Sequence, residues 1–158
     1  MFSLLATLLG SSYRCWAVDL RGHGLTETPP SVPYAWSGLA NDVLAAVDGL
    51  SLDQPAAFGH SSGGAAVLLA EAERPGTFSS LWCYEPIVWP DPDEARARAA
   101  TLAEGARHRR DRFPSKDEAQ ANFASKRPFS ALAPAGWLLP SVTRRWCWMP
   151  FAIMCSTS

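Results

Sequence analysis

The five residues Gly59-His60-Ser61-Ser62-Gly63 carry the clearest chemical signal in this chain of 158 residues. They match G-x-S-x-G, a sharp strand-to-helix turn that lifts a serine hydroxyl above a parallel sheet. Ser62 cannot take the place of Ser61, because the matching glycine would then fall at His60. A serine hydroxyl is a weak nucleophile until a histidine takes its proton and an acid orients that histidine. The pattern therefore predicts nucleophilic catalysis at Ser61, with a base and an acid still to be found.

Strands alternate with helices on both sides of this turn, which is typical of an α/β fold. A helix is expected over about 37–49, because Leu39, Val43, Val47 and Leu50 recur at three- and four-residue spacing. The opening "MFSLLATLLG" is typical of a helix that ends at Gly10. We expect a partial parallel sheet of about three strands, flanked by helices. The strands are "YRCWAVDL", "QPAAFGH" and "FSSLWCYEPIVW", and "SGGAAVLLAEAERPG" is a further helix.

The composition changes twice along the chain and suggests three segments. Residues 1–90 are expected to form the partial α/β core. Residues 91–136 are polar and alanine-rich, and we expect a helical lid segment there. Its long helix has an acidic first turn and a basic last turn, which matches the helix dipole. Ser115 and Glu118 form a capping-box pattern that starts a second, shorter helix.

Residues 137–158 form an atypical tail with three tryptophans, two cysteines and no acidic residue. The tail shows neither a clear period nor a capping signal. We expect it to be unstructured and foreign to the fold, as after a change of reading frame. An apolar tail that binds a partner or an interface is the alternative.

"AVDLRGHGLTETPP" followed by "FGHSSGGAAVLLA" resembles the α/β-hydrolase family, and the resemblance covers about residues 1–130. It implies that Ser61 is the nucleophile and that Gly59 and Gly63 permit the tight turn. It also implies that the backbone N–H of Ser62 is an oxyanion donor, aided by the start of the following helix. In the motif Asp19-Leu20-Arg21-Gly22-His23-Gly24, the resemblance implies structural roles for the aspartate and the histidine.

The base and the acid are harder to place. The family's triad runs in the order serine, acid, histidine, and His108 is the one histidine beyond Ser61. Its arginine neighbours disfavour an imidazolium, so a solvated surface position is the alternative. His60 adjoins Ser61 but projects in another direction from the sharp turn. Glu85 is the candidate acid, because some family members carry the acid after this strand; the alternative is that it ends the strand.

Several parts of the family pattern are missing, so two functions stay open. Family members carry strands and a second oxyanion donor before the helix that corresponds to "FSLLATLLG", and we expect this chain to lack them. We therefore expect a gap in the sheet between the strands "CWAVDL" and "PAAFGH". The first function is a serine hydrolase that acts on an ester-like or other carbonyl substrate through an acyl-enzyme and is impaired in this truncated chain. The second is a non-catalytic, truncated or pseudogene-like fragment that keeps the turn.

The composition of the chain limits the classes of partner, cellular location and cofactor that we expect. A net charge of -1 gives no reason to expect nucleic acid. No run reaches the roughly 18 apolar residues of a membrane span, and the first residues lack the basic start of a signal peptide. We therefore expect a cytoplasmic protein with a small-molecule substrate; the sequence does not determine its oligomeric state. The four cysteines show no metal-binding spacing, so no metal or other cofactor is expected. Cys15 and Cys83 are expected to be buried, reduced thiols.

Overall fold

The computed structural model describes residues 7–108, 110, 112–126 and 151–157. These residues belong to two compact units. The core unit consists of Phe2–Val88 and Cys147–Ser158, and the helical unit consists of Trp89–Trp146 together with Met1.

The core unit alternates strands and helices, as the sequence predicts. Residues 7–9 are helical, whereas residues 1–6 of the expected first helix lie outside the described residues. The remaining elements are a 3-10 turn Gly10–Ser12, β1 Tyr13–Asp19, α2 Trp36–Gly49, β2 Ala56–His60, α3 Ser62–Glu73, β3 Ser80–Tyr84 and β4 Phe151–Thr157. The α/β class is confirmed.

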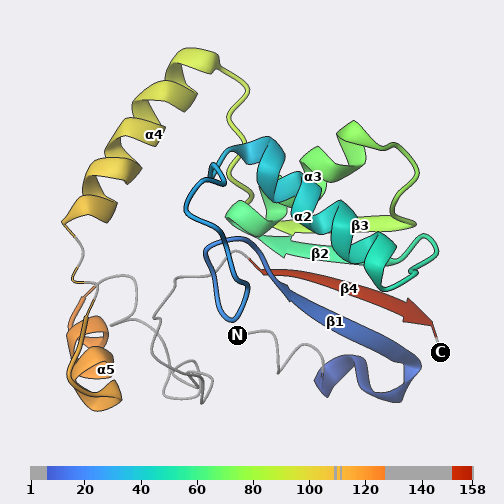
Figure 1. Cartoon of the computed structure of the whole chain (residues 1–158), viewed down its shortest axis with the longest axis horizontal. Helices are drawn as coiled ribbons and strands as arrows, with labels where there is room; N and C mark the ends of the chain where they lie inside the picture. The colour runs from blue at the N-terminus through green and yellow to red at the C-terminus, as the bar shows by residue number, and fades with distance from the viewer. Residues whose placement is uncertain (1–6, 109, 111, 127–150, 158) are drawn as a thin grey trace. The chain divides into compact units, whose positions relative to one another are not determined.

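The sheet has four strands in the order β1-β4-β2-β3, and it is mixed rather than wholly parallel (Figure 1). β2 and β3 are parallel, whereas β4 is antiparallel to both β1 and β2. The gap that we expected between β1 and β2 is therefore occupied by β4. Because β4 pairs on both sides, it satisfies the backbone groups that β1 and β2 would otherwise leave unpaired.

β4 lies within the stretch 137–158 that we expected to be unstructured, and for residues 151–157 the structure differs from that expectation. Ile153, Met154 and Cys155 are consecutive in β4 and all buried. A central strand that is buried on both faces shows a continuous apolar run instead of alternation. That is why the tail lacks a recognisable period. Residues 137–150 and 158 lie outside the described residues.

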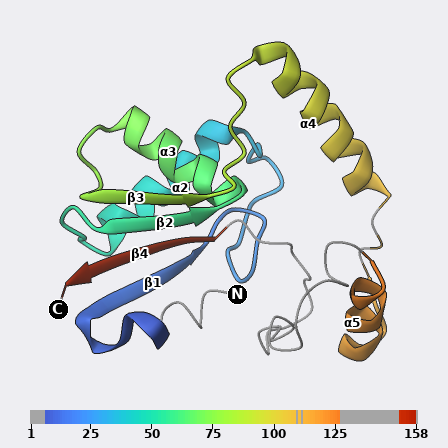
Figure 2. The same cartoon turned by 180° about the vertical axis from the view of Figure 1, so that it is seen from behind.

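α2 and α3 cover one face of the sheet, as Figures 1 and 2 both show. Leu39, Val43 and Val47 of α2 are buried, which confirms most of the predicted stripe. Leu50 follows the end of α2 and is 43% exposed, so it does not belong to that stripe. From α3 the small residues Ala66, Val67 and Ala70 enter the same cluster, and from the sheet Ala57 and Met154 do.

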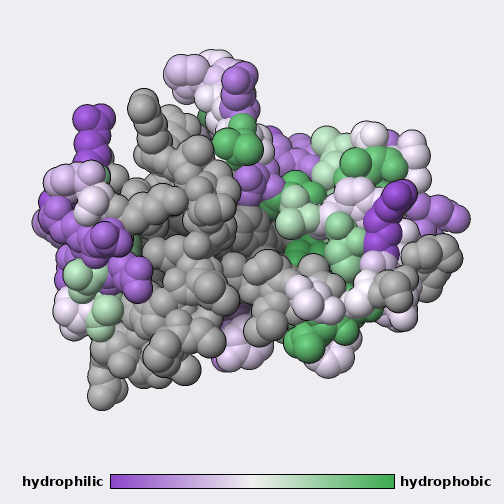
Figure 3. Space-filling model, turned by 90° about the horizontal axis from the view of Figure 1, so that it is seen from below, coloured by the Kyte–Doolittle hydropathy of each residue, from purple (hydrophilic) through white to green (hydrophobic). Residues whose placement is uncertain are grey.

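β3 lies at the edge of the sheet and has one buried and one open face. Leu81 and Cys83 pack against the main core cluster, whereas Trp82 and Tyr84 are 73% and 63% exposed. In Figure 3 hydrophobic residues (green) reach the surface of the core unit, whereas the helix α5 (Lys116–Ala124) carries mainly hydrophilic ones (purple).

The helical unit contains α4 Pro92–Arg107 and α5 Lys116–Ala124. The Asp91 carboxylate caps α4 by accepting the backbone N–H groups of Asp93 and Glu94 at 2.7 and 3.2 Å. The Ser115 hydroxyl accepts the N–H of Glu118 at 3.1 Å, which confirms the predicted start of α5. The carboxylate of Glu118 bonds to Arg110 at 2.7 Å.

The position of β4 predicts a large effect of truncating one of its side chains. Ile153 is 2% exposed, so Ile153→Ala removes buried methyl groups and leaves a cavity. We expect the free energy of unfolding, measured by urea titration, to fall by about 2–4 kcal/mol. The matched control is Leu25→Ala at a side chain that is 74% exposed, where a change within about 0.5 kcal/mol is expected. Equal effects of the two substitutions would contradict the central position of β4.

Candidate active site

Ser61 occupies the single residue between the end of β2 and the start of α3. Its backbone has φ 56° and ψ -121°, a conformation that residues with a side chain rarely adopt. Strain of this kind costs on the order of 1–3 kcal/mol and persists only where the surroundings enforce it. The sharp turn that the G-x-S-x-G pattern predicts is therefore present in the backbone.

Three backbone hydrogen bonds hold Ser61 in this conformation. Its N–H donates to the carbonyl oxygen of Tyr84 at 3.0 Å, and its own carbonyl oxygen accepts from Ala65 and Ile87, both at 3.1 Å. Ala65 belongs to α3, whereas Tyr84 ends β3 and Ile87 follows it. The turn is thus anchored to its own helix and to the segment that leaves the neighbouring strand.

Two glycines allow the strand and the helix to approach each other at this turn. A Cβ atom on Gly59 would lie 2.6 Å from the backbone oxygen of Gly63 and 2.6 Å from the backbone nitrogen of Gly64. A Cβ on Gly64 would lie 2.9 Å from Cβ of Pro86. Gly63 is buried in the first turn of α3. The sequence analysis did not identify Gly64 as part of the turn, although the two consecutive glycines of "SSGG" could have indicated it.

The Ser61 hydroxyl makes no capping hydrogen bond to α3. Nor does a side chain in the described part of the chain bond to it. Ser62 is the first residue of α3, where a backbone N–H has no acceptor within the helix. A hydroxyl at a helix start and an N–H beside it are the arrangement that a nucleophile and an oxyanion donor require.

The three histidines have different surroundings. The ring of His60 lies 5.4 Å from that of Tyr84, centroid to centroid, so it packs against β3 beside the turn. Nδ1 of His23 lies 2.9 Å from the carbonyl oxygen of Arg21. His108 belongs to the exposed surface of the helical unit, where its Nε2 lies 2.7 Å from the Glu104 carboxylate. Among the residues that the structure describes, none of these rings is hydrogen-bonded to the Ser61 hydroxyl.

Glu85 lies in the segment that anchors Ser61, directly after Tyr84. It is exposed and has a positive φ of 47°, which turns the chain out of β3. Within the described residues its carboxylate has no hydrogen-bond or ion-pair partner. Its role as the acid stays a prediction, as does the role of His108 as the base.

The loop after β1 is organised by an ion pair between Arg21 and Asp42. The guanidinium donates to both carboxylate oxygens, at 2.8 Å from Nε and 2.7 Å from Nη2, and the Arg21 backbone N–H adds a bond of 2.9 Å. Burial disfavours the charged carboxylate, but the bonds and charge of Arg21 outweigh it, so the pKa of Asp42 lies below its ordinary value. Bonding to Asp42 likewise raises the pKa of Arg21.

Asp19 stabilises the same loop. Its carboxylate accepts the backbone N–H of Leu25 at 3.1 Å, and its carbonyl oxygen accepts the hydroxyl of Thr26. Gly24 has a positive φ, and a Cβ there would overlap the Asp19 carboxylate. These contacts agree with the structural role that we expected for Asp19.

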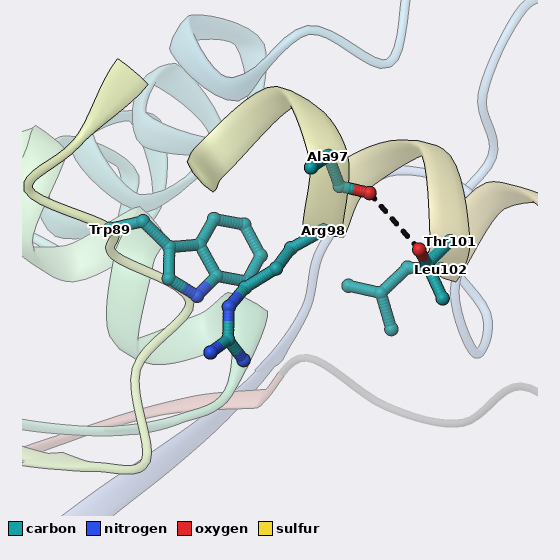
Figure 4. Close-up of a pocket in the computed structure, with 5 residues that line it drawn as sticks. All are labelled: Trp89, Ala97, Arg98, Thr101 and Leu102. Atoms are coloured by element: carbon teal, nitrogen blue, oxygen red, sulfur yellow. Dashed lines mark hydrogen bonds between the residues drawn. The ribbon is translucent and has the colours of Figure 1, made fainter. Parts of the chain in front are cut away.

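A pocket of about 300 Å³ lies within the helical unit and is lined by Trp89, Ala97, Arg98, Thr101 and Leu102 (Figure 4). The close-up shows the Arg98 side chain beside the Trp89 indole. Arg98 is paired with Glu94 at 2.7 Å, and the Thr101 hydroxyl donates to the carbonyl of Ala97 at 3.1 Å. The pocket contains none of the residues predicted for catalysis.

Comparison with known proteins shows the family to which the chain belongs. The sequence model of the alpha/beta hydrolase family matches residues 1–154. This chain belongs to the alpha/beta hydrolase family.

Its relatives include lipases and an acyltransferase. Human monoglyceride lipase is 35% identical over 96 residues, which make up 58% of this chain and 32% of the lipase. The mouse monoglyceride lipase is 36% identical over 92 residues, which make up 56% of this chain and 30% of that lipase. Ethanol acetyltransferase 1 of Hanseniaspora uvarum is 31% identical over 78 residues, 48% of this chain and 23% of that enzyme. The match thus spans about a third of the length of the lipases.

No solved structure matches the chain significantly. Among the described helices, none combines the length and the apolar character that crossing a membrane requires.

The close approach at Gly59 predicts that Gly59→Ala destabilises the fold. The added Cβ meets rigid backbone rather than a flexible side chain, so we expect a loss of about 3 kcal/mol or more in the free energy of unfolding. Gly105→Ala in α4 is the matched control, because a Cβ there meets open space. It should stabilise by about 0.5–1 kcal/mol. Urea unfolding followed by circular dichroism tests both; an unchanged Gly59→Ala variant would contradict the tight turn.

The Arg21–Asp42 pair predicts a pH-dependent stability. Unfolded Asp has a pKa of about 3.9, and the folded value is lower, so the contribution of the pair is complete above about pH 4 and is lost as the pH falls through the folded pKa. Asp42→Asn should lower the free energy of unfolding by roughly 1–2 kcal/mol at pH 7. This difference from the wild type should shrink below about pH 4. Exposed Asp53→Asn serves as control; a difference for Asp42→Asn that does not vary with pH would refute the prediction.

Proposed function

We propose that this protein is a serine hydrolase that cleaves an ester-like carbonyl substrate through an acyl-enzyme on Ser61. The backbone of Ser61 carries the proposal: a positive φ at a strand-to-helix turn, held by hydrogen bonds from two directions. Membership of the family and the similarity to two monoglyceride lipases support an ester as the substrate class.

In the proposed reaction the Ser61 oxygen attacks the substrate carbonyl carbon while a base takes the hydroxyl proton. The negative charge that develops on the carbonyl oxygen is stabilised by the N–H of Ser62 and by the start of α3. The leaving alcohol takes up a proton, and water then releases the acyl group from Ser61. Gly59 contributes because a side chain there would clash with the backbone of Gly63 and Gly64. We propose that Gly63, buried in the first turn of α3, likewise permits the turn.

We propose Glu85 as the acid and His108 as the first candidate for the base. Glu85 follows Tyr84, whose carbonyl oxygen accepts the N–H of Ser61, so the acid is linked to the nucleophile through one short segment. His108 is the histidine that follows Ser61 in the chain, and Glu104 is its partner in the described structure.

A non-catalytic protein that retains the turn is the alternative function. It is favoured by one observation, namely that in the described residues no histidine is hydrogen-bonded to the Ser61 hydroxyl. Loss of the triad histidine costs about a million-fold in turnover in a serine protease. The two functions therefore differ sharply in the reactivity of Ser61.

Labelling with a fluorophosphonate probe separates these functions. We expect purified wild-type protein to react and Ser61→Ala to lose all labelling, because the probe bonds only to an activated serine oxygen. Ser62→Ala is the matched control: it removes the neighbouring hydroxyl but keeps the backbone N–H, so labelling should stay within a few-fold of wild type. His108→Ala and His60→Ala in the same assay identify the base by a loss of about 100-fold or more.

Folded wild-type protein that does not label would exclude the hydrolase proposal for this chain. Labelling that persists in Ser61→Ala would show that a residue other than Ser61 is the nucleophile. Circular dichroism of every variant shows whether the fold is retained.

A further inference from the structure

Two cysteines from opposite ends of the chain lie directly across from each other in the sheet. β1 and β4 run side by side along their length (Figure 1), and in their antiparallel register Cys15 pairs with Cys155. Residues paired in this way have Cα atoms about 4.5–5.5 Å apart. Disulfides join residues whose Cα atoms are about 4.4–6.8 Å apart, so the register meets the Cα distance that a disulfide requires.

The side chains of this pair also meet. Directly opposite residues of antiparallel strands point to the same face of the sheet. Accordingly Cys15 and Cys155 belong to one apolar cluster, which they share with Ile153, Leu9 and Phe58. Both thiols are free. Burial, together with Cys15, raises the pKa of Cys155 to about 12.

The other cysteines do not share this arrangement. Cys83 lies in β3, packs against the cluster under α2 and α3, and contacts the carbonyl oxygen of Gly64 at 3.8 Å. Burial raises the pKa of its thiol. Cys147 lies outside the described residues. Among the described cysteines, Cys15 and Cys155 are thus the pair placed for bond formation.

We propose that Cys15 and Cys155 form a disulfide between β1 and β4 when the protein meets a small-molecule disulfide such as oxidised glutathione. Cys15 is half-buried and Cys155 is buried, so Cys15 attacks first. Its thiolate displaces one glutathione thiolate and forms a mixed disulfide. Cys155 then attacks the Cys15 sulfur and releases the second glutathione. Two protein thiols are oxidised, one glutathione disulfide is reduced to two thiols, and the two protein protons pass to the released thiolates.

The second step is slow near neutral pH and accelerates in mild alkali, because only the Cys155 thiolate attacks. The completed bond joins residues near the two ends of the chain, so it constrains the unfolded state strongly. A bridge over a loop of this length should raise the midpoint of thermal unfolding by roughly 10 °C. The site is independent of Ser61 and does not rest on the proposed hydrolase function.

The experiment uses the full chain carrying Cys83→Ala and Cys147→Ala, which retains the pair. Its matched control carries Cys15→Ala in addition. Both are incubated at about pH 8.5 with excess oxidised glutathione and are then digested without reductant for mass spectrometry. We expect a peptide linked through Cys15 and Cys155 and a higher unfolding midpoint in the first variant, both reversed by dithiothreitol. The control should show neither.

Mapping the bonds in oxidised wild-type protein keeps the test valid if a variant fails to fold. A Cys15–Cys155 link there supports the proposal. A persistent glutathione adduct on Cys15 or a link through Cys83 or Cys147 in its place would refute it, and so would two free thiols after complete exposure to the oxidant.

Discussion

β4 supplies the hydrogen-bonding partners for two strands, β1 and β2, that are not neighbours in the sheet. Without β4, the sheet would have a gap between β1 and β2 with two rows of unpaired N–H and C=O groups. Such unpaired groups destabilise the fold when they are buried and favour aggregation when they are exposed. The antiparallel strand satisfies both rows and places Met154 beneath the helices and Ile153 on the opposite face. β2 leads directly into the Ser61 turn, so the pairing of β2 with β4 also stabilises the strand that carries the candidate nucleophile.

The turn itself combines a steric requirement with hydrogen bonds from separate elements. Gly59 lets the backbone of α3 approach β2, and Pro86 closes the turn against Gly64. The bonds from Ser61 to Tyr84 and Ile87 then connect this turn to the end of β3. A strained residue that is held from two sides keeps its backbone in one conformation, and preorganisation of this kind is what an acyl-transfer site needs.

The two faces of the sheet differ in composition. Small residues of α3 pack closely on one face, whereas the other carries exposed Trp82 and Tyr84 and the cluster that contains Cys15 and Cys155. The packing of the first face could be predicted from the sequence, because Leu39, Val43 and Val47 recur at the spacing of one helix face. Neither cysteine of the second face shows a motif, because their relation depends on the register of two strands that are far apart in the chain.

The amino-acid sequence was sufficient for the α/β class, three strands, the two core helices and the turn at Ser61. The steric constraint at Gly59 acts on Gly63 and Gly64, a few positions further along the chain, so a short sequence pattern shows it. The bonds from Ser61 to Tyr84 and Ile87 come from a distant part of the chain and were seen only in the structure. The structure alone revealed β4, the Arg21–Asp42 pair and the meeting of Cys15 with Cys155. These features join residues that are distant in the chain. In addition, a strand buried on both faces lacks the alternation of apolar and polar residues by which a strand is predicted from sequence. Long-range pairing is decided by which backbone groups remain to be satisfied once the local elements have formed.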